Sequence, residues 1–408
     1  MRIAMVSEHA SPLAALGGAD AGGQNVHVAE LSAAMSRRGH EVVVYTRRDD
    51  TELPDRVVAP GGYTVVHVPA GPAAILPKDE LLDYMGEFGE FLAGQWGSEP
   101  PAIAHAHFWM SGVAARLAAR RCRIPMVQTF HALGVVKRRH QGVRDTSPPA
   151  RAELEKLLAR STDWVAATCT DEVFELVRLG RPRSRTSVIP CGVDLQHFNP
   201  DGPAAARTGR PRIVTVGRMV QRKGFDVLVE AMRCVPHAEL VIVGGPAADE
   251  LAADPEAARL TGLADEMGVG DRVRLIGSVS RADMPAILRS ADVVACTPWY
   301  EPFGIVPVEA MACGIPVLAA AVGGMLDTVV DGVTGMLVPP RDPHACAGAL
   351  NAMFADRVRL AQWGRAGRRR AEARYSWDRI AADTLKIYQR MAAAARSTTA
   401  ATGGRQSG

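Results

Sequence analysis

Two glutamates flank a Phe-Gly turn in the segment Glu301-Pro-Phe-Gly-Ile-Val-Pro-Val-Glu309, which follows the apolar run 291–296. A loop carboxylate accepts hydrogen bonds from sugar hydroxyls, and the unpaired N–H groups that open a helix hold a phosphate. The second carboxylate lies about two turns into the expected helix, within reach of a ribose diol. The segment therefore predicts a nucleotide-sugar site. A helix that opens with acidic residues to suit its dipole would explain one glutamate near the start, but not the other.

Two cations form a second candidate group, in Gly217-Arg218-Met-Val-Gln-Arg-Lys223-Gly224. This loop follows the predicted strand 212–217 and precedes a helical pattern. Arg218 and Lys223 could neutralise a diphosphate leaving group, which is the main electrostatic task in cleaving a sugar–phosphate bond. A solvated loop would explain the two charges equally well, but their place at a strand end favours the functional interpretation.

A histidine and a basic run follow another predicted strand. His131 ends Thr129-Phe-His131, so we expect it at the ligand-binding edge of the sheet, where an imidazole bonds a sugar hydroxyl or moves a proton. A lone histidine is more often structural, so its weight comes from this position. The run 137–140 fits an acceptor phosphate, an anionic lipid or plain solvent. Arg151 stands at an expected helix start, where the dipole disfavours a cation, which indicates an anionic ligand nearby.

The sequence gives little indication of a metal. His105 and His107 alternate and so share one face of a strand, but no carboxylate cluster accompanies them. Lining of the core or of a ligand site explains this pair better. No Asp-x-Asp segment stands at a strand end. We therefore expect neither a metal nor a cofactor.

Two glycine-rich stretches also stand at strand ends. The stretch 17–23, between the first predicted strand and the first helix, has two interpretations: its glycines let the backbone approach a phosphate, or it is a surface loop. It does not match the dinucleotide fingerprint GxGxxG. Gly323-Gly324 likewise lets a sugar diphosphate approach backbone or forms a turn.

Short apolar runs alternate with helical patterns along the chain, which predicts parallel strands covered on both faces. The stretch 199–211, rich in Pro, Gly and Ala, reads as a linker between two α/β domains, and 408 residues are enough for both. Ligands of such doubly wound sheets bind beyond the carboxyl ends of the strands, so the expected site is a cleft between the domains. The predicted strands are 2–7, 41–46, 64–68, 103–106, 126–129, 164–167, 187–189, 212–217, 239–243, 273–276, 293–296 and 316–319.

Composition narrows the class of protein further. Hydrophobic residues make up 47% and charged residues 22%, which is a soluble globular balance, and a net charge of +3 does not suggest nucleic acid. Seven cysteines without CxxC spacing favour a reducing cytoplasm. We find no apolar stretch long enough to span a bilayer and no signal peptide, although the basic run leaves peripheral membrane contact open. The oligomeric state is not indicated.

At this point the motifs resemble a known family. The segment 301–317, with Gly217-Arg218 and Lys223-Gly224, resembles the signature of the family 4 retaining glycosyltransferases, which have the GT-B fold. Residues 22–28 are similar to that family's N-terminal loop and helix, and Tyr375-Ser-Trp377 to the start of its terminal helix. Within the family, Gly-Gly-Gln-Asn-Val and Phe-His-Ala-Leu-Gly-Val-Val-Lys are most similar to the sucrose-phosphate-synthase-like group, which also resembles the inositol-phosphate glycosyltransferases.

The resemblance implies a GT-B arrangement of two Rossmann-like domains that face a central cleft. An acceptor-binding domain would span 1–200 and a nucleotide-sugar-binding domain 201–376. A terminal helix over 377–395 would cross back to the first domain. The small polar residues 396–408 predict a disordered tail.

The resemblance also implies roles for the site residues. At the donor diphosphate it implies Arg218 and Lys223, with Gly23 nearby. At the donor sugar it implies Glu301 and the backbone of Phe303, Gly304 and Ile305, with His131 nearby. It implies Glu309 at the ribose. Asn25, Lys137 and Arg151 would face a phosphorylated acceptor. Gln24 and the run 137–140 depart from the inositol-phosphate enzymes, so the acceptor stays open.

The implied reaction moves a hexose, glucose or N-acetylglucosamine, from a nucleoside diphosphate sugar to a small sugar, cyclitol or sugar-phosphate acceptor. The family favours a UDP-sugar, retention at the anomeric carbon, and a leaving phosphate that takes the acceptor's proton. Glu301, His131, Lys223 and Arg218 form the expected catalytic group. Three alternatives stay open: a lipid or secondary-metabolite acceptor, a nucleotide-sugar 2-epimerase, and a non-catalytic nucleotide-sugar-binding protein.

Overall fold

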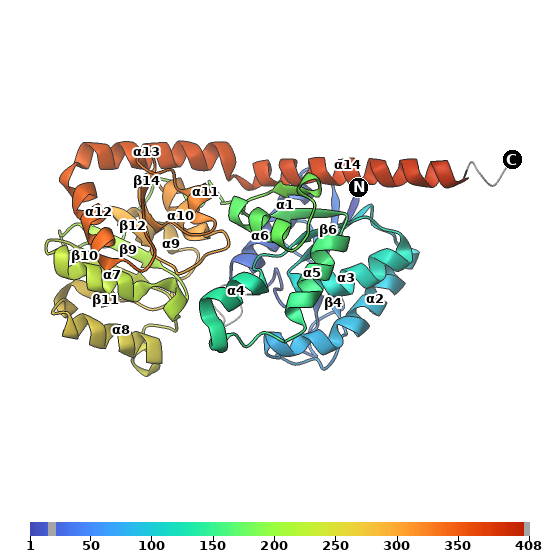
Figure 1. The fold of residues 1–408 in the computed structure, drawn as a ribbon, viewed down its shortest axis with the longest axis horizontal. Coiled ribbons are helices and arrows are strands. Elements are labelled where there is room, and N and C mark those ends of the chain that lie inside the picture. The colour runs from blue at the N-terminus through green and yellow to red at the C-terminus, as the bar shows by residue number, and fades with distance from the viewer. Residues whose placement is uncertain (15–21, 404–408) are drawn as a thin grey trace. The chain divides into compact units, whose positions relative to one another are not determined.

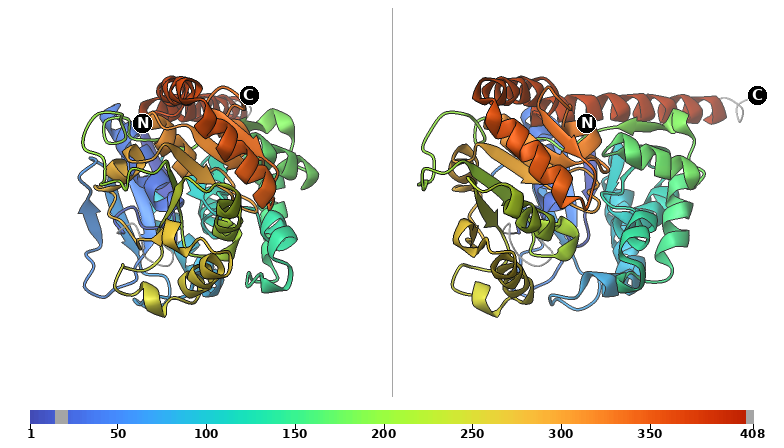
Figure 2. Two further views of the ribbon diagram at one scale, coloured as in Figure 1. Left: turned by 90° about the vertical axis from the view of Figure 1, so that its left-hand side faces the viewer. Right: turned by 60° about the vertical axis from the view of Figure 1, so that its left-hand side comes forward.

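The computed structural model describes residues 1–14 and 22–403, with side chains up to residue 394. It divides into two compact units (Figure 1). Unit 1 comprises Met1–Pro190 and the chain from Trp377 onward, and unit 2 comprises Cys191–Ser376. Each unit is a largely parallel sheet with helices packed on it (Figures 1 and 2). The predicted fold class of two doubly wound α/β domains is confirmed.

The sheet of unit 1 has the strand order β3-β4-β2-β1-β5-β6-β7-β8. All its neighbouring strands are parallel except the pair β3–β4, which is antiparallel. Its strands are β1 (Arg2–Val6), β2 (Glu41–Arg47), β3 (Arg56–Val58), β4 (Thr64–Val68), β5 (Ile103–His107), β6 (Met126–Thr129), β7 (Trp164–Ala167) and β8 (Thr186–Val188). Its helices are α1 (Gly23–Arg37), α2 (Met85–Ser98), α3 (Trp109–Cys122), α4 (Gly134–Gln141), α5 (Arg151–Ser161), α6 (Thr170–Arg178) and α14 (Trp377–Gly403), with the 3-10 helix η1 (Lys78–Tyr84).

The sheet of unit 2 has the order β11-β10-β9-β12-β13-β14, and every neighbouring pair is parallel. Its strands are β9 (Arg212–Val216), β10 (Glu239–Val243), β11 (Val273–Leu275), β12 (Val293–Cys296), β13 (Val317–Ala320) and β14 (Gly335–Val338). Its helices are α7 (Phe225–Ala231), α8 (Pro255–Glu266), α9 (Met284–Arg289), α10 (Ile305–Ala312), α11 (Met325–Thr328), α12 (Pro343–Ala355) and α13 (Arg357–Arg374), with the 3-10 helix η4 (Gln221–Lys223).

The predicted strands all form, and two further strands do not appear in the sequence pattern. β3 is a three-residue edge strand with partly exposed side chains, so it lacks an apolar run. β14 begins at Gly335 and has only its first and last residues buried. The apolar signal therefore marks strands covered on both faces and misses short or exposed edge strands.

Each unit has its own apolar core. In unit 1, helices α2 and α3 pack on the sheet through fully buried Phe88 and Trp109. In unit 2, Leu228 of α7, Leu260 of α8 and Leu350 of α12 belong to one cluster with the strands. These cores hold the sheets rigid, so that the loops at their carboxyl edges start from fixed positions.

The terminal helix extends further than predicted. α14 runs to Gly403, beyond residue 395, because an alanine-rich segment has high helix propensity, which the expectation of a disordered tail underrated. Residues 404–408 of that tail lie outside the described part. Within unit 1, α14 packs on α1 and β5, and the Tyr388 hydroxyl lies 2.6 Å from His105 Nδ1.

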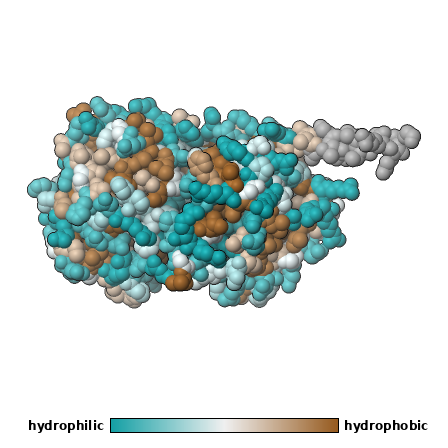
Figure 3. All heavy atoms as spheres, in the orientation of Figure 1, coloured by the Kyte–Doolittle hydropathy of each residue, from teal (hydrophilic) through white to brown (hydrophobic). Residues whose placement is uncertain are grey.

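The described residues contain no helix with the length and apolarity needed to cross a membrane. All seven cysteines, which lie in the described ranges, are free thiols. On the face drawn in Figure 3, apolar residues are interspersed with hydrophilic ones.

Candidate active site

The centre of the unit 2 sheet brings two predicted motifs to one edge. β9 and β12 are neighbours, and the chain winds outward from them in opposite directions. Loops that leave such a pair diverge, and ligands of parallel sheets bind in the opening between them. The loop after β9 carries Lys223, and the loop after β12 carries Glu301. Strand order therefore joins residues that lie 78 positions apart in sequence.

Gly224 sets how closely these two loops approach. Its φ is +67°, and a Cβ at this position would lie 2.0 Å from the carbonyl oxygen of Thr297. The Thr297 hydroxyl donates to the Gly224 carbonyl at 2.8 Å, and the Trp299 N–H donates to the carbonyl of Arg222 at 2.9 Å. Only glycine fits this contact without moving backbone, so it holds Lys223 beside the Glu301 loop.

Lys223 and Glu301 form a half-buried ion pair. Lys223 Nζ lies 2.5 Å from Glu301 Oε2, and the side chains are 20% and 13% exposed, respectively. Burial alone would raise the pKa of Glu301, but the charges of Lys223 and Arg222 outweigh burial and lower this pKa below its usual value. Glu301 is therefore an anion at neutral pH and can accept hydrogen bonds from hydroxyls.

Two arginines complete the positive surroundings of Glu301. Arg218 is exposed, and its charge also lowers the pKa of Glu301. Arg222 was not among the residues predicted for this site. Its guanidinium lies 5.4 Å from the ring centroid of Tyr300, and its buried Nη1 has no hydrogen-bond partner in the described part of the chain. The Arg-Lys dipeptide in the loop was the sequence signal that could have indicated it.

The Phe-Gly turn opens α10, as the sequence predicted. Gly304 has a φ of +81° and directly precedes the first helical residue, Ile305. The Gly324 N–H donates to the Glu301 carbonyl at 3.0 Å, and a Cβ on Gly324 would lie 2.4 Å from the Cα of Phe303. The Gly323-Gly324 pair thus packs against the turn itself, which explains these glycines without a ligand.

Glu309 lies in the second turn of α10 and is 8% exposed. Burial raises its pKa to about 7, although the charge of Arg281, whose Nη1 lies 3.7 Å from Glu309 Oε1, opposes this rise. The ionised carboxylate can accept hydrogen bonds from both hydroxyls of a diol, whereas the protonated group donates one of its own. Arg281 belongs to no motif in the sequence and was not predicted.

In unit 1 the chain winds outward from β1 and β5. Residues 15–21 of the predicted glycine loop lie outside the described residues, and Gly23 is the first residue of α1. Asn25 Oδ1 accepts a hydrogen bond from the Gly22 N–H at 2.9 Å, and Asn25 Nδ2 donates to the Ser11 carbonyl at 2.9 Å. Through these two bonds Asn25 shapes the loop, and its acceptor role stays a prediction.

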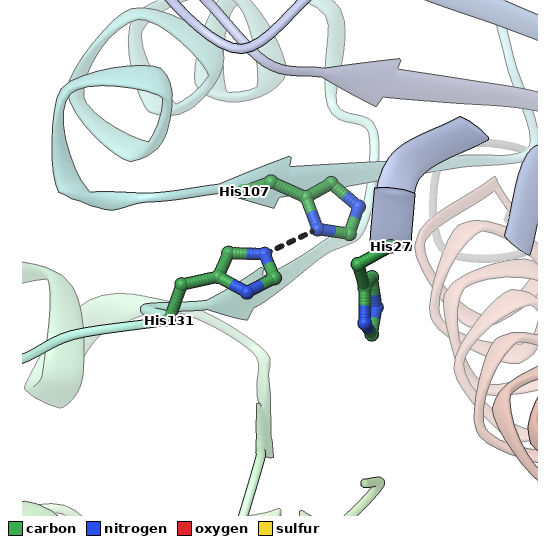
Figure 4. A group of neighbouring side chains, drawn as sticks. All are labelled: His27, His107 and His131. Carbon is green, nitrogen blue, oxygen red and sulfur yellow. Dashed lines mark hydrogen bonds between the residues drawn. The ribbon is translucent and has the colours of Figure 1, made fainter. Parts of the chain in front are cut away.

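His131 follows β6 with a φ of +60°, which is rare for a residue other than glycine. Its Nε2 lies 3.0 Å from Nδ1 of His107 (Figure 4). Burial lowers the pKa of both residues well below the usual value, so both rings are neutral and one donates to the other. A strained backbone held in this way is typical of functional positions.

Lys137 and Arg151 meet at one serine. The Ser147 hydroxyl lies 3.0 Å from Lys137 Nζ and 3.1 Å from Arg151 Nη1. Lys137 also pairs with Asp145 at 2.9 Å, and Arg151 with Glu155 at 2.8 Å. Burial would raise the pKa of Asp145, but hydrogen bonds from Lys137 and Ser147 lower it to about 2.

Arg151 needs no bound anion to explain its position. Its partner Glu155 lies one turn further along α5, and the Arg151 side chain is only 4% exposed. A carboxylate of the same helix balances the charge, so the helix dipole alone gives no reason to expect an anion here. Arg151 Nη2 also donates to the Ala132 carbonyl at 2.9 Å, which ties α5 to the His131 segment.

The sequence did not indicate a further cation at this edge of the sheet. Lys78, in η1, has its Nζ 5.5 Å from the ring centroid of Phe108, and the guanidinium of Arg151 lies 5.2 Å from the same centroid. Phe108 has a φ of +79° at the start of α3. Lys78 lies in a polar segment without a motif, so only the fold reveals it.

His105 and His107 are both buried, as the interpretation as core lining predicted, and their ring centroids lie 4.2 Å apart. His105 Nδ1 lies 2.6 Å from the Tyr388 hydroxyl, and His105 Nε2 lies 2.8 Å from Thr129 Oγ1. Nδ1 thus helps to dock α14 on the sheet, while Nε2 bonds the neighbouring strand β6. His107 instead contacts His131.

Comparison with known proteins identifies the family. Residues 21–197 match the family model described as Glycosyltransferase Family 4, and residues 201–370 match the model Glycosyl transferases group 1. A D-inositol 3-phosphate glycosyltransferase of Xylanimonas cellulosilytica is 41% identical over 95% of this chain and 96% of its own length. One from Catenulispora acidiphila is 36% identical over 95% of each chain.

Solved structures give the same result for the fold. A sucrose-phosphate synthase from Thermosynechococcus elongatus has a TM-score of 0.87 and 32% identity, covering 96% of this chain and 99% of its own. Anabaena HepE, solved with UDP and glucose, has a TM-score of 0.73 and 20% identity, covering 95% and 99%, and so supports the fold alone. The chain belongs to glycosyltransferase family 4 and is a hexosyltransferase with the GT-B fold.

Proposed function

We propose that this enzyme transfers a hexose from a UDP-sugar, bound by unit 2, to a hydroxyl of a cyclitol phosphate, bound by unit 1, with retention at the anomeric carbon. The Lys223–Glu301 contact carries the proposal, because it sets a carboxylate for a sugar beside a cation for a diphosphate. Relatives named D-inositol 3-phosphate glycosyltransferases support the acceptor class.

On the donor, each group has a chemical task. Lys223 and Arg218 neutralise the departing diphosphate, and Arg222 adds a third charge to the same surroundings. Glu301 and the backbone from Phe303 to Ile305 orient the sugar. Glu309 accepts hydrogen bonds from the ribose hydroxyls, and Gly23 lies near the diphosphate.

The acceptor phosphate is assigned to Lys137, with Lys78 as a second cation. Lys137 is 20% exposed and shares its charge with a single carboxylate, so a phosphate can join this pair. Arg151 is buried and fully engaged, and it acts as a positioning residue through Ser147. His131 hydrogen-bonds the donor sugar as a neutral imidazole.

The chemistry follows from these charges. The bond from the anomeric carbon to the diphosphate oxygen breaks as the acceptor hydroxyl attacks from the same face. The leaving phosphate takes the hydroxyl proton, so Glu301 positions the sugar and need not form a covalent bond. No metal or cofactor takes part in this scheme, so full activity in excess chelator is expected.

The test is product analysis of the purified chain with UDP-glucose or UDP-N-acetylglucosamine and an inositol phosphate. We expect one new glycoside whose anomeric configuration, read by NMR, matches that of the donor. Inversion would refute retention. An epimerised sugar in the reaction without acceptor would favour a 2-epimerase, and tight donor binding without turnover across an acceptor panel would favour a binding protein.

A hexose phosphate is the second acceptor candidate, because the sucrose-phosphate synthase from Thermosynechococcus elongatus is 32% identical over 96% of this chain. Fructose 6-phosphate therefore belongs in the same panel. A clear preference for it over the cyclitol phosphate would replace the proposed acceptor.

A further inference from the structure

Three histidines from separate segments converge in unit 1. His27 lies in α1, His107 ends β5, and His131 follows β6 (Figure 4). Each can offer one ring nitrogen, and these nitrogens all lie within 4.8 Å of one another. The sequence suggested only the neighbours His105 and His107, so the fold assembles a different group.

The distances are close to those of a tetrahedral site. Zn–N bonds of about 2.05 Å place neighbouring ligand nitrogens about 3.3 Å apart. His107 Nδ1 and His131 Nε2 are already 3.0 Å apart. The remaining distances in the group are at most 4.8 Å, so an ion would require His27 to move closer to the other two rings.

The group also has few hydrogen bonds to lose. His107 bonds to His131 through Nδ1, and its buried Nε2 has no hydrogen-bond partner among the described residues. By contrast, both nitrogens of His105 are occupied by Tyr388 and Thr129. Coordination through His107 Nδ1 would therefore displace the hydrogen bond to His131.

We propose that His27, His107 and His131 form a site for a borderline transition-metal ion such as Zn²⁺. Three imidazoles supply the protein ligands, and an exogenous ligand such as water would take the fourth position. Binding holds the His131 ring on the metal. If His131 contacts the donor sugar as proposed above, the ion is an inhibitor of transfer and not a cofactor.

Direct metal binding by the full chain tests the site without any assay of transfer. We expect one Co²⁺ per chain with the visible absorption of tetrahedral cobalt, and its displacement by Zn²⁺ in competition with a chromogenic chelator. His27→Asn and His107→Asn should each weaken binding at least about tenfold, since loss of a ligand costs no less than loss of its outer-shell support.

His40→Asn is the matched control. The N-terminal amine lies 3.3 Å from His40 Nδ1 and is an alternative metal site in the same unit. The control should bind Co²⁺ as the wild type does. Absence of stoichiometric binding, loss of binding in His40→Asn alone, or a sulfur-to-cobalt charge-transfer band would overturn the proposal.

X-ray absorption of the Zn²⁺-loaded wild type provides a second readout if a histidine variant fails to fold. Three imidazole ligands are expected, and one or none would refute the site. Zn²⁺ that binds in this way without slowing transfer would contradict only the proposed role of His131, so the two proposals fail separately.

Discussion

Removal of the Lys223 ammonium is the sharpest test of the donor site. Lys223→Ala leaves Glu301 half-buried without its nearest cation, since only Arg218 and Arg222 still act on it. The diphosphate loses a fixed positive charge at the atoms where negative charge develops. The two effects can be measured separately, one in the rate and the other in stability.

The magnitude follows from the surroundings of the pair. One preorganised group that stabilises developing charge is worth about 10²- to 10³-fold in rate, or about 3–4 kcal/mol. The Lys223 side chain is 20% exposed, so solvent screens part of its charge, and two arginines remain nearby. We therefore expect the lower end of this range, a loss of about a hundredfold in kcat/KM.

Initial rates of UDP release at saturating acceptor measure this loss, with Lys223→Arg as the charge-conserving control. A folded Lys223→Ala enzyme within about threefold of the wild-type kcat/KM would refute the assignment.

Stability provides an independent measurement on the same variant. Without Lys223, burial dominates and the pKa of Glu301 rises, because burial is the largest influence on this group. A raised carboxyl pKa stabilises the fold at low pH, and this stabilisation is lost as the pH rises through the folded pKa. Lys223→Ala should therefore lose stability relative to wild type as the pH rises through the raised pKa of Glu301. Adding Glu301→Gln should remove that loss.

Three further predictions follow from the geometry. The pKa of Glu309 is about 7, so its carboxylate forms as the pH rises through neutrality, and donor affinity should increase over the same range. Calorimetric titrations of UDP should show this increase. Glu309→Gln should give an affinity that does not change with pH. The same raised pKa means that Glu309 stabilises the fold below its unfolded pKa and that this contribution is lost towards pH 7, which urea unfolding of the Gln variant checks. Gly224→Ala places a Cβ 2.0 Å from a carbonyl oxygen and should lower the free energy of unfolding by more than about 2 kcal/mol. Gly262→Ala is the control, because a Cβ at this position in α8 has nothing within 4 Å, and it should raise the free energy of unfolding by about 0.5–1 kcal/mol. Thermal melts measure both. Tyr388→Phe leaves His105 Nδ1 buried without a partner and should cost about 1–3 kcal/mol in urea unfolding; no change would show that α14 does not depend on this bond.

The sequence predicted most of the fold because parallel strands covered on both faces have a local signal. Each is a short apolar run, and each run stands between helical patterns. β3 and β14 lack that signal, since one is an exposed edge and the other begins with Gly335. The extent of α14 was also misjudged, because small residues near a terminus support helix as well as disorder.

The same difference between local signals and long-range packing separates the predicted site residues from those that were missed. Lys223, Glu301 and Glu309 stand in recognisable motifs, so the sequence could indicate them as candidates. Arg281 and Lys78 belong to no motif, and only the strand order carries them to their places.

Roles were harder to predict than positions. Asn25 and Arg151 were expected to face an acceptor, yet both are bonded within unit 1. A side chain's partner depends on which distant segments converge on it, and that information is spread over the chain.

By itself, the sequence determined the strands that are covered on both faces and the motifs, because local periodicity and backbone preference decide them. Only the tertiary structure decided that Lys223 meets Glu301, that His105 docks a helix and that His27 joins His107 and His131. The physical reason is that strand order and close glycine contacts bring these groups together, and both arise from packing over long sequence separations.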